Sequence, residues 1–584
     1  MTKPFAKQLG FMENERVYHN LINRFLKASS KAVGLIFAIV MIMAVVLSGF
    51  GVRIAIAQPE SVSLEYFRLP QKNLFVFTTV EDFQQGETDG TVVIDSGNGA
   101  VILKDSVSSG TYTSPVVETE PFEYMVLSWN AETPDSTYIE IQGRVHVLGE
   151  WSHWISWGKW SSTAFTEKNR LNLPGSSGHA NEDGLAKIAI DELIVKGQAG
   201  ETGDAFQYRL TLFAPENGNA GVTPKVRLVA CTLRNTLPGQ AIPKLYPEDA
   251  PDLSSFEMDL DVPTYSQYTR DPAISGSICS PTCVAMVLGY YGVDISPEES
   301  AWNARDYEEG IFGNWSFNVA SAASYGFTSY VDYVVPEEGA DPWYPVKHQI
   351  AANRPVIVSV RYRKPGFPSP LPPVEGVPID HTGGHLVLIR GFTWKDGIEY
   401  VIVNDPAASH NDEVRREYPA DQFFDAWVKK VAYVLYEDEK EIKEAEAVFR
   451  PMPFAAQLIP VGKQKDGYQK FRLQADDEAI EISTLNIRSI VVSYNGEKTE
   501  PVALRSFGED SDLLWLEVES EPGTYTFTFM GRNKDYYRAE IVWPLPKSNT
   551  LIFTAVGLVI AAVACIAMIM SKQKARKSGT AVTK

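Results

Sequence analysis

The sequence predicts a multidomain chain, in which an α+β domain lies between two β-sandwich domains and a hydrophobic membrane segment lies near each end. Three observations predict this class. In two regions, short segments in which apolar and polar residues alternate are separated by turn residues. The region between them has a helical pattern followed by strands, and two apolar runs flank all three regions. At roughly 100–200 residues per domain, a chain of 584 residues can supply several packed cores.

The expected domain boundaries follow these changes of pattern. They are a cytoplasmic segment at 1–31, a signal peptide or transmembrane helix at 32–57, a β-sandwich at 58–240, an α+β domain at 241–440, a smaller β-sandwich at 441–548, a transmembrane helix at 549–570 and a basic cytoplasmic tail at 571–584.

Both apolar runs have about the ~20 residues that a helix needs to cross a bilayer. Basic residues precede the first run and follow the second, so the positive-inside rule places both ends in the cytoplasm. We therefore expect a protein of the cell membrane with the bulk of its chain extracellular. Ala55-Ile56-Ala57 is also typical of a signal-peptide cleavage site, which leaves two interpretations of the first run.

Charge and cysteine content narrow the classes of partner and origin. The formal net charge is −20 although both ends are basic, so the exported part is acidic, which argues against a nucleic-acid partner. The cysteines are Cys231, Cys279, Cys283 and Cys565. An exported chain of this size without a disulfide framework favours a bacterial origin over a eukaryotic secretory route.

The first sandwich is predicted from period-two segments such as Tyr124–Trp129 and Lys225–Ala230. Within it, four tryptophans recur in WSHWISWGKW, at Trp151, Trp154, Trp157 and Trp160. Indole rings can stack on sugars, which allows contact with carbohydrate or cell wall. They can equally cover the sandwich core and its rim.

The central region begins with a helix predicted at Pro281–Gly292, where apolar residues recur every three or four positions. Further helices are expected at 297–303, 315–325, 345–353 and 420–428, and strands at 356–362, 385–392, 398–403 and 432–436. The stretch Lys364–Pro378 holds six prolines. It is interpreted either as a stiff surface excursion or as a wall beside a cleft.

Cys279 comes directly before the first predicted helix. Backbone N–H groups and the helix dipole favour negative charge there, which raises the thiolate fraction of a cysteine. The position also suits a buried apolar filler. Cys283 falls inside the helix and is expected in the core. The C-x3-C spacing lacks a second Cys/His pair, so neither a metal nor another cofactor is expected.

A predicted hairpin supplies a base for that thiol. His385 opens an apolar strand, and the strand 398–403 runs back to Asn404-Asp405. If the loop is 393–397, His385 lies opposite Asp405, with Cβ atoms ~5 Å apart. This is the nucleophile, base and orienting group that acyl transfer requires. A slip of one residue would separate the pair onto opposite faces, and His381 is the alternative base.

The segments CSPTCVAMVLGYYG, GGHLVLIRGF and VIVNDP together resemble the C39-like peptidases of the papain-like clan, over about residues 262–437. The resemblance implies a papain-like α+β fold for this domain. It also implies that Cys279 is the nucleophile, His385 the general base, Asp405 the orienting residue and Gln267 a donor to the oxyanion.

The expected function is therefore that of a bacterial, membrane-anchored, extracytoplasmic cysteine peptidase, which hydrolyses a peptide or protein substrate through a Cys-His-Asp triad. Two alternatives stay open. One is a non-catalytic surface adhesin or peptide-binding protein with a degenerate peptidase fold. The other is a peptidoglycan endopeptidase or amidase.

Overall fold

The structure is a computed structural model that describes residues 71–96, 98–162, 181–196, 200–215, 221–246, 250–437, 454–465, 468–475, 487–494, 497–499, 513–517, 522–531 and 536–543. All of them belong to one compact unit, Leu64–Lys584.

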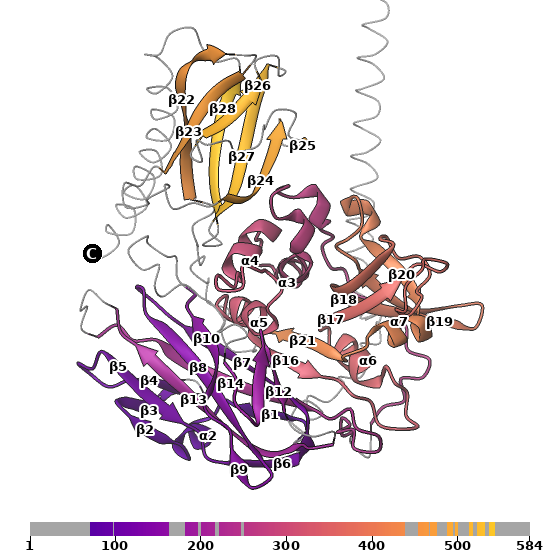
Figure 1. Cartoon of the computed structure of the whole chain (residues 1–584). Helices are drawn as coiled ribbons and strands as arrows, with labels where there is room; N and C mark the ends of the chain where they lie inside the picture. Colours follow the sequence, from indigo (N-terminus) through magenta and orange to yellow (C-terminus); the bar gives the residue numbers. More distant parts are fainter. Residues whose placement is uncertain are drawn as a thin grey trace, which may run out of the picture. The chain divides into compact units, whose positions relative to one another are not determined.

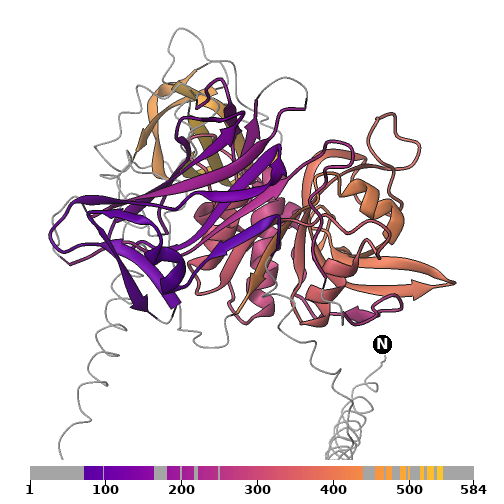
Figure 2. The ribbon, with the colours of Figure 1, turned by 90° about the horizontal axis from the view of Figure 1, so that it is seen from below.

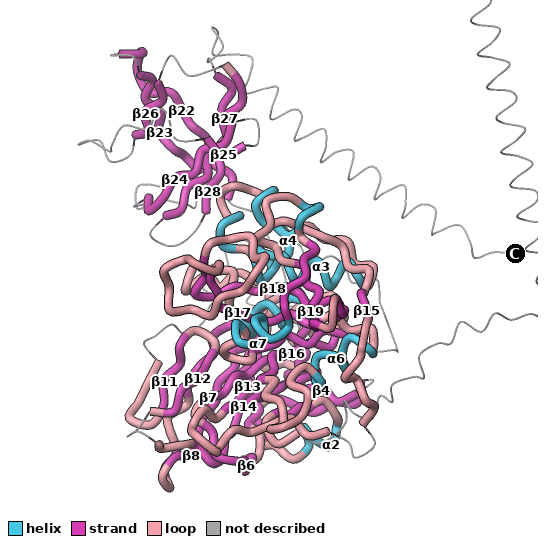
Figure 3. The backbone as a smooth tube through the Cα atoms, turned by 90° about the vertical axis from the view of Figure 1, so that its right-hand side faces the viewer, coloured by secondary structure: helices cyan, strands magenta, loops and turns pink. Residues whose placement is uncertain are grey.

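Strand dominates this structure and corrects the predicted fold class. Strands make up 45% of the structure and helices 16%. The predicted class, an α+β domain with terminal membrane segments, is therefore wrong for this structure. Within the described ranges the longest helix has 12 residues, about 18 Å, against the ~30 Å of a bilayer core. None of the described helices is long and apolar enough to span a membrane. The predicted segments 32–57 and 549–570 lie outside the described residues. Figure 3 shows the short helices among the strands.

The N-terminal region consists of two seven-stranded sheets that enclose one core (Figures 1 and 2). The first sheet has the order β11-β12-β7-β14-β4-β3, with β1 on β14. The second has the order β10-β8-β13-β5-β2, with β6 on β13 and β9 on β8. Their bounds are β1 Leu74–Phe77, β2 Glu87–Asp89, β3 Thr91–Ser96, β4 Asn98–Leu103, β5 Ser109–Thr113, β6 Val117–Phe122, β7 Tyr124–Glu132, β8 Tyr138–Val147, β9 Glu150–Trp151, β10 Ile155–Trp160, β11 Ala186–Ala189, β12 Glu192–Val195, β13 Gly203–Phe213 and β14 Lys225–Arg234. A short helix, α2 (Val80–Gln84), joins β1 to β2.

The tryptophan cluster divides between the inside and the outside of this sandwich. Trp157 and Trp160 are fully buried in the core. Trp151 and Trp154 are half-buried, and the Arg144 guanidinium lies 4.7 Å and 4.6 Å from their ring centroids. The interpretation as core and rim is therefore confirmed for the two buried rings.

The following domain, up to Tyr436, is a third seven-stranded sheet with helices packed against it. The sheet has the order β16-β21-β17-β18-β19-β20, with β15 on β18, and every pair is antiparallel. Its strands are β15 Met258–Asp259, β16 Thr328–Tyr333, β17 Val356–Arg363, β18 His381–Lys395, β19 Ile398–Asn404, β20 Arg415–Pro419 and β21 Val431–Tyr436. Its helices are α3 Cys279–Tyr290, α4 Pro297–Asn303, α5 Trp315–Ala323, α6 Tyr344–Ala351 and α7 Ala420–Ala426, and its 3-10 turns are Gln267–Thr269, Ser275–Ser277 and Asn411–Glu413.

Helix α3 is central rather than amphipathic, which corrects the predicted apolar stripe. Every residue from Ser280 to Leu288 is buried, because α3 packs against α4, α5 and β18. A helix that is apolar all round belongs to a core. The helix also begins at Cys279, two residues before the predicted start.

The sandwich and the sheet domain each contribute residues to the core of the other. Phe317 and Ala320 of α5 belong to the sandwich core, where the Phe317 ring lies 5.2 Å from that of Trp160. The Asn130 side chain donates to the Ser329 carbonyl at 2.6 Å and accepts from the Ser329 N–H at 3.2 Å, as a neighbouring strand would. The first sandwich sheet is therefore covered on both faces, and the two domains pack as one body.

The hairpin β18–β19 differs from its predicted register. Its loop is the two-residue turn Asp396-Gly397, with positive φ at both residues, so Phe392 pairs with Val401 instead of Ile398. That shift of three would put His385 and Asp405 on opposite faces. A bulge at Arg390 moves the register back by one residue, so Leu388 pairs with Asn404 and the two side chains return to one face.

The C-terminal region forms a fourth sheet, of order β25-β24-β27-β28-β22-β23-β26. Its strands are β22 Phe454–Lys465, β23 Tyr468–Ala475, β24 Ile487–Tyr494, β25 Glu497–Thr499, β26 Leu513–Glu517, β27 Gly523–Gly531 and β28 Tyr536–Trp543.

Candidate active site

Cys279 is the first residue of α3 and is half-buried. The other cysteines in the described part of the chain, Cys231 and Cys283, are fully buried. Among the described cysteines, Cys279 alone combines access to solvent with a place at a helix N-terminus, where the unpaired N–H groups favour a thiolate.

His385 lies between Cys279 and Asp405. Its Nε2 is 2.7 Å from Oδ1 of Asp405, and its ring is close enough to the Cys279 thiol to lower the pKa of that thiol. Since Nε2 engages the carboxylate, Nδ1 is the ring nitrogen left to exchange a proton with the thiol. The three side chains come from the start of α3, from β18 and from the residue after β19. The structure thus brings together three of the four predicted site residues in one row.

The electrostatics of this row favour charge separation. Burial disfavours the Cys279 thiolate, but the hydrogen bond and charge of His385, with the N–H groups of Leu386 and Ser280, outweigh it and lower the pKa of Cys279. Burial likewise opposes the imidazolium, yet Asp405 and Cys279 raise the pKa of His385. Both shifts therefore favour the pair of thiolate and imidazolium.

Gln267 lies in the 3-10 turn Gln267–Thr269. Its backbone N–H donates to the Pro406 carbonyl at 2.8 Å, directly after Asp405. Its side-chain Nε2 donates to the Ser275 carbonyl at 2.8 Å and so folds the loop before Cys279 back on itself. An amide nitrogen carries two hydrogens, and this bond uses one of them. Its role as an oxyanion donor stays a prediction.

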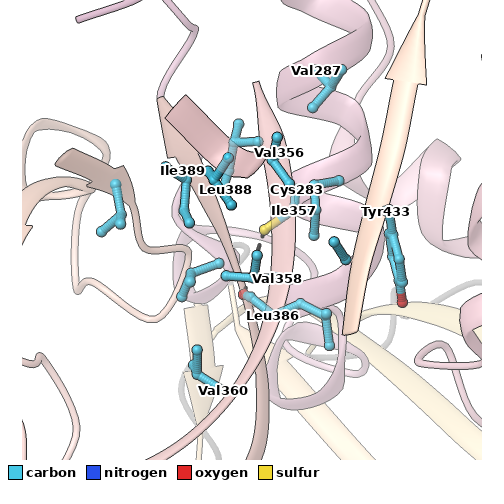
Figure 4. Close-up of a cluster of buried hydrophobic side chains, with 14 of the residues drawn as sticks. Cys283, Val287, Val356, Ile357, Val358, Val360, Leu386, Leu388, Ile389 and Tyr433 are labelled. Atoms are coloured by element: carbon cyan, nitrogen blue, oxygen red, sulfur yellow. Dashed lines mark hydrogen bonds between the residues drawn. The ribbon is translucent and has the colours of Figure 1, made fainter. Parts of the chain in front are cut away.

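The two rival residues have other surroundings. Cys283 Sγ lies 3.4 Å from the Leu386 carbonyl oxygen, among core residues such as Val287 and Ile357 (Figure 4). Burial raises the pKa of this thiol well above its usual value. His381 is exposed at the start of β18, where its ring stacks on Phe367 with centroids 4.6 Å apart.

Tyrosines around the row were missed by sequence reasoning. The Tyr418 hydroxyl donates to Oδ2 of Asp405 at 2.8 Å, and the Tyr362 ring meets His385 edge-on at 6.1 Å. Tyr418 lies in β20, which no periodicity predicted, and reaches Asp405 only through the pairing of β20 with β19. No local sequence signal could have found it.

The proline-rich stretch is fixed in place. Val374 and Val377 are buried, the Gly376 carbonyl accepts from Arg416 at 2.9 Å, and the Glu375 N–H donates to Gln422 at 2.9 Å. The segment therefore packs on β20 and α7. In the described ranges no cluster of three or more His, Cys, Asp or Glu side chains could hold a metal ion.

Comparisons with known proteins locate similarity in two segments. Residues 259–433 match the family described as Peptidase_C39 like family, and residues 73–233 match the Peptidase C39 N-terminal domain. No curated protein matches the chain.

Two solved structures show weak similarity. The C-terminal CBM6 of LamC, a marine laminarinase from Zobellia galactanivorans, is 8% identical, covers 27% of this chain and 99% of its own, and has a TM-score of 0.16. A mouse coronavirus receptor-binding domain complexed with its murine receptor is 12% identical, covers 33% and 85%, and has a TM-score of 0.12. At these TM-scores neither structure informs fold or function. The chain thus contains a segment similar to the C39-like peptidase family, preceded by a segment similar to the Peptidase C39 N-terminal domain.

Proposed function

We propose that this protein is a papain-like cysteine peptidase that hydrolyses peptide bonds through Cys279, His385 and Asp405. The observation that carries the proposal is the row of three side chains, in which the half-buried Cys279 at a helix N-terminus lies beside an imidazole whose Nε2 is 2.7 Å from the buried Asp405 carboxylate. The match of residues 259–433 to the C39-like family supports the reaction class.

The chemistry follows from this arrangement. The Cys279 thiolate attacks the peptide carbonyl carbon, and the tetrahedral oxyanion is stabilised by the Cys279 N–H and by the Gln267 amide. The His385 imidazolium then gives its proton to the leaving amine, which leaves an acyl-enzyme. A water molecule gives a proton to His385 and attacks the thioester. This step releases the acid and restores the Cys279 thiolate and the His385 imidazolium.

A thiol-directed probe tests the reactivity of the site. We expect iodoacetamide at neutral pH to modify Cys279 and to leave Cys231 and Cys283 unmodified, because the latter two are buried and uncharged. Peptide mapping by mass spectrometry identifies the labelled residue. Labelling of Cys283 in preference to Cys279 contradicts the assignment.

The pH dependence of hydrolysis should have two limbs. Below the lowered pKa of Cys279 the nucleophile is protonated, and above the raised pKa of His385 the proton donor to the leaving amine is lost. The value of kcat/KM should therefore form a plateau that includes neutral pH and falls on either side. A single rise at the pKa of an ordinary thiol, ~8.5, contradicts the ion pair.

We further propose that the protein acts on the outer side of the cell membrane. The basic ends and acidic remainder of the sequence support this location. Protease added to intact cells should cleave the sandwich and peptidase domains, whereas a cytoplasmic control protein stays intact.

A further inference from the structure

The Asp405 carboxylate is fully buried and has three hydrogen-bond donors. Oδ1 receives His385 Nε2 at 2.7 Å and the Ala407 N–H at 2.9 Å, whereas Oδ2 receives the Tyr418 hydroxyl at 2.8 Å. The first two donors hold one oxygen. Tyr418 donates to the other oxygen, and a donor on that second oxygen opposes rotation of the carboxylate about its Cβ–Cγ bond.

The position of Tyr418 is itself strongly determined. Its side chain is fully buried, it pairs with Val401 of β19, and its ring stacks on Phe423 of α7 with centroids 5.5 Å apart. The hydroxyl is therefore presented to Asp405 by packing on two other elements and loses little side-chain freedom on binding it.

We propose that Tyr418 is a positioning residue for the proposed peptidase site, which holds the Asp405 carboxylate ionised and aimed at His385. This rests on the proposed function for its catalytic meaning, but its effect on the thiol can be measured without any substrate. Tyr418 does not touch the reacting atoms and acts through Asp405 and His385.

The physical reason lies in the burial of the carboxylate. A buried anion that loses one of its donors is relieved by taking up a proton or by turning away from its partner. Either change weakens the hydrogen bond to His385, which makes the imidazolium less favourable and, with it, the Cys279 thiolate. The titratable groups that bear on this row are His385 from β18, Tyr418 from β20, Tyr362 from β17, Tyr268 from the turn before α3, and Cys279 and Cys283 from α3, with Arg416 as the nearby cation.

The test is the rate of Cys279 alkylation by iodoacetamide from pH 4 to pH 10, in the full chain and in Tyr418→Phe. We expect the acid limb of the pH–rate profile to lie about one pH unit higher in the variant. At a pH within this limb, alkylation is then about tenfold slower than in the wild type. Tyr325→Phe is the matched control, because this buried hydroxyl also accepts from Asn303 and donates to Glu299. It should leave the limb unmoved.

Two outcomes overturn the proposal. Either the acid limb of the pH–rate profile stays at its wild-type position in Tyr418→Phe, or it shifts equally in Tyr325→Phe. If Tyr418→Phe does not fold, 3-fluorotyrosine placed at position 418 keeps the ring and is a stronger donor. The limb should then move to lower pH, and an unchanged or raised limb overturns the proposal. Peptide hydrolysis is measured in parallel. A shifted limb in a protein that cleaves no peptide supports the positioning role and rejects the proposed function, so the two failures are distinguishable.

Discussion

Replacing Cys279 with alanine is expected to reduce peptide hydrolysis by a factor on the order of 10⁶, down to the detection limit, because the reaction loses its nucleophile. Serine at this position should be nearly as inactive. Its hydroxyl has a far higher pKa than a thiol, so a site that stabilises a thiolate beside an imidazolium does not ionise it. Turnover of a fluorogenic peptide measures both effects. The unfolding transition of each variant is compared with that of the wild type, to show that the variant is folded.

Cys283→Ala is the matched control for this experiment. This second cysteine of the same helix lies in the core, and its loss should lower stability modestly while leaving kcat/KM close to the wild-type value. The proposed mechanism fails if Cys279→Ala retains turnover or if Cys283→Ala abolishes it in a folded protein.

The second large effect concerns stability. Phe317→Ala is expected to destabilise the protein by about 3–5 kcal/mol, because it opens a cavity in a fully buried site. The ring lies 5.9 Å from that of Trp129 and 5.2 Å from that of Trp160, both in the sandwich, although Phe317 itself belongs to α5. Urea unfolding followed by tryptophan fluorescence gives the loss.

Hydrogen exchange shows where that loss falls. If the two domains share one core, protection should decrease together in β7 of the sandwich and in β16 and β17 of the sheet domain. Ile398→Ala, at an exposed hairpin position, is the control and should cost less than about 0.5 kcal/mol. Loss of protection in the peptidase domain alone would contradict a shared core.

The sequence predicted most elements that depend on local pattern. Helix α4 begins and ends where predicted, and strands β17, β19 and β21 are close to their expected bounds. The pairing between strands was less accessible. Asp396-Gly397 carries a strong signal for a two-residue turn, and recognising it would have corrected the loop. The bulge at Arg390 has a weaker signal, the isolated Gly391, where a side chain would collide with the Met258 backbone.

In the candidate site too, the residues marked by local pattern could be predicted, whereas the contacts that depend on strand pairing could not. Cys279 and His385 could be selected from their positions at the start of a helix and of a strand. Their approach to Asp405 depends on two register shifts of opposite consequence, and the contact with Tyr418 depends on a strand that was not predicted. The all-round burial of α3 was also hidden, because it results from packing against elements far apart in the sequence.

The shared core has a consequence for synthesis of the chain. Ser316 donates to the Leu127 carbonyl at 2.6 Å, and these residues are 189 positions apart. At about 5–20 residues per second, roughly 10 to 40 seconds pass between translation of β7 and of α5. During that time one face of the first sandwich sheet has no cover, and its backbone groups and apolar side chains are open to non-native contacts. A nascent chain of this protein should therefore need a holding chaperone until α5 leaves the ribosome.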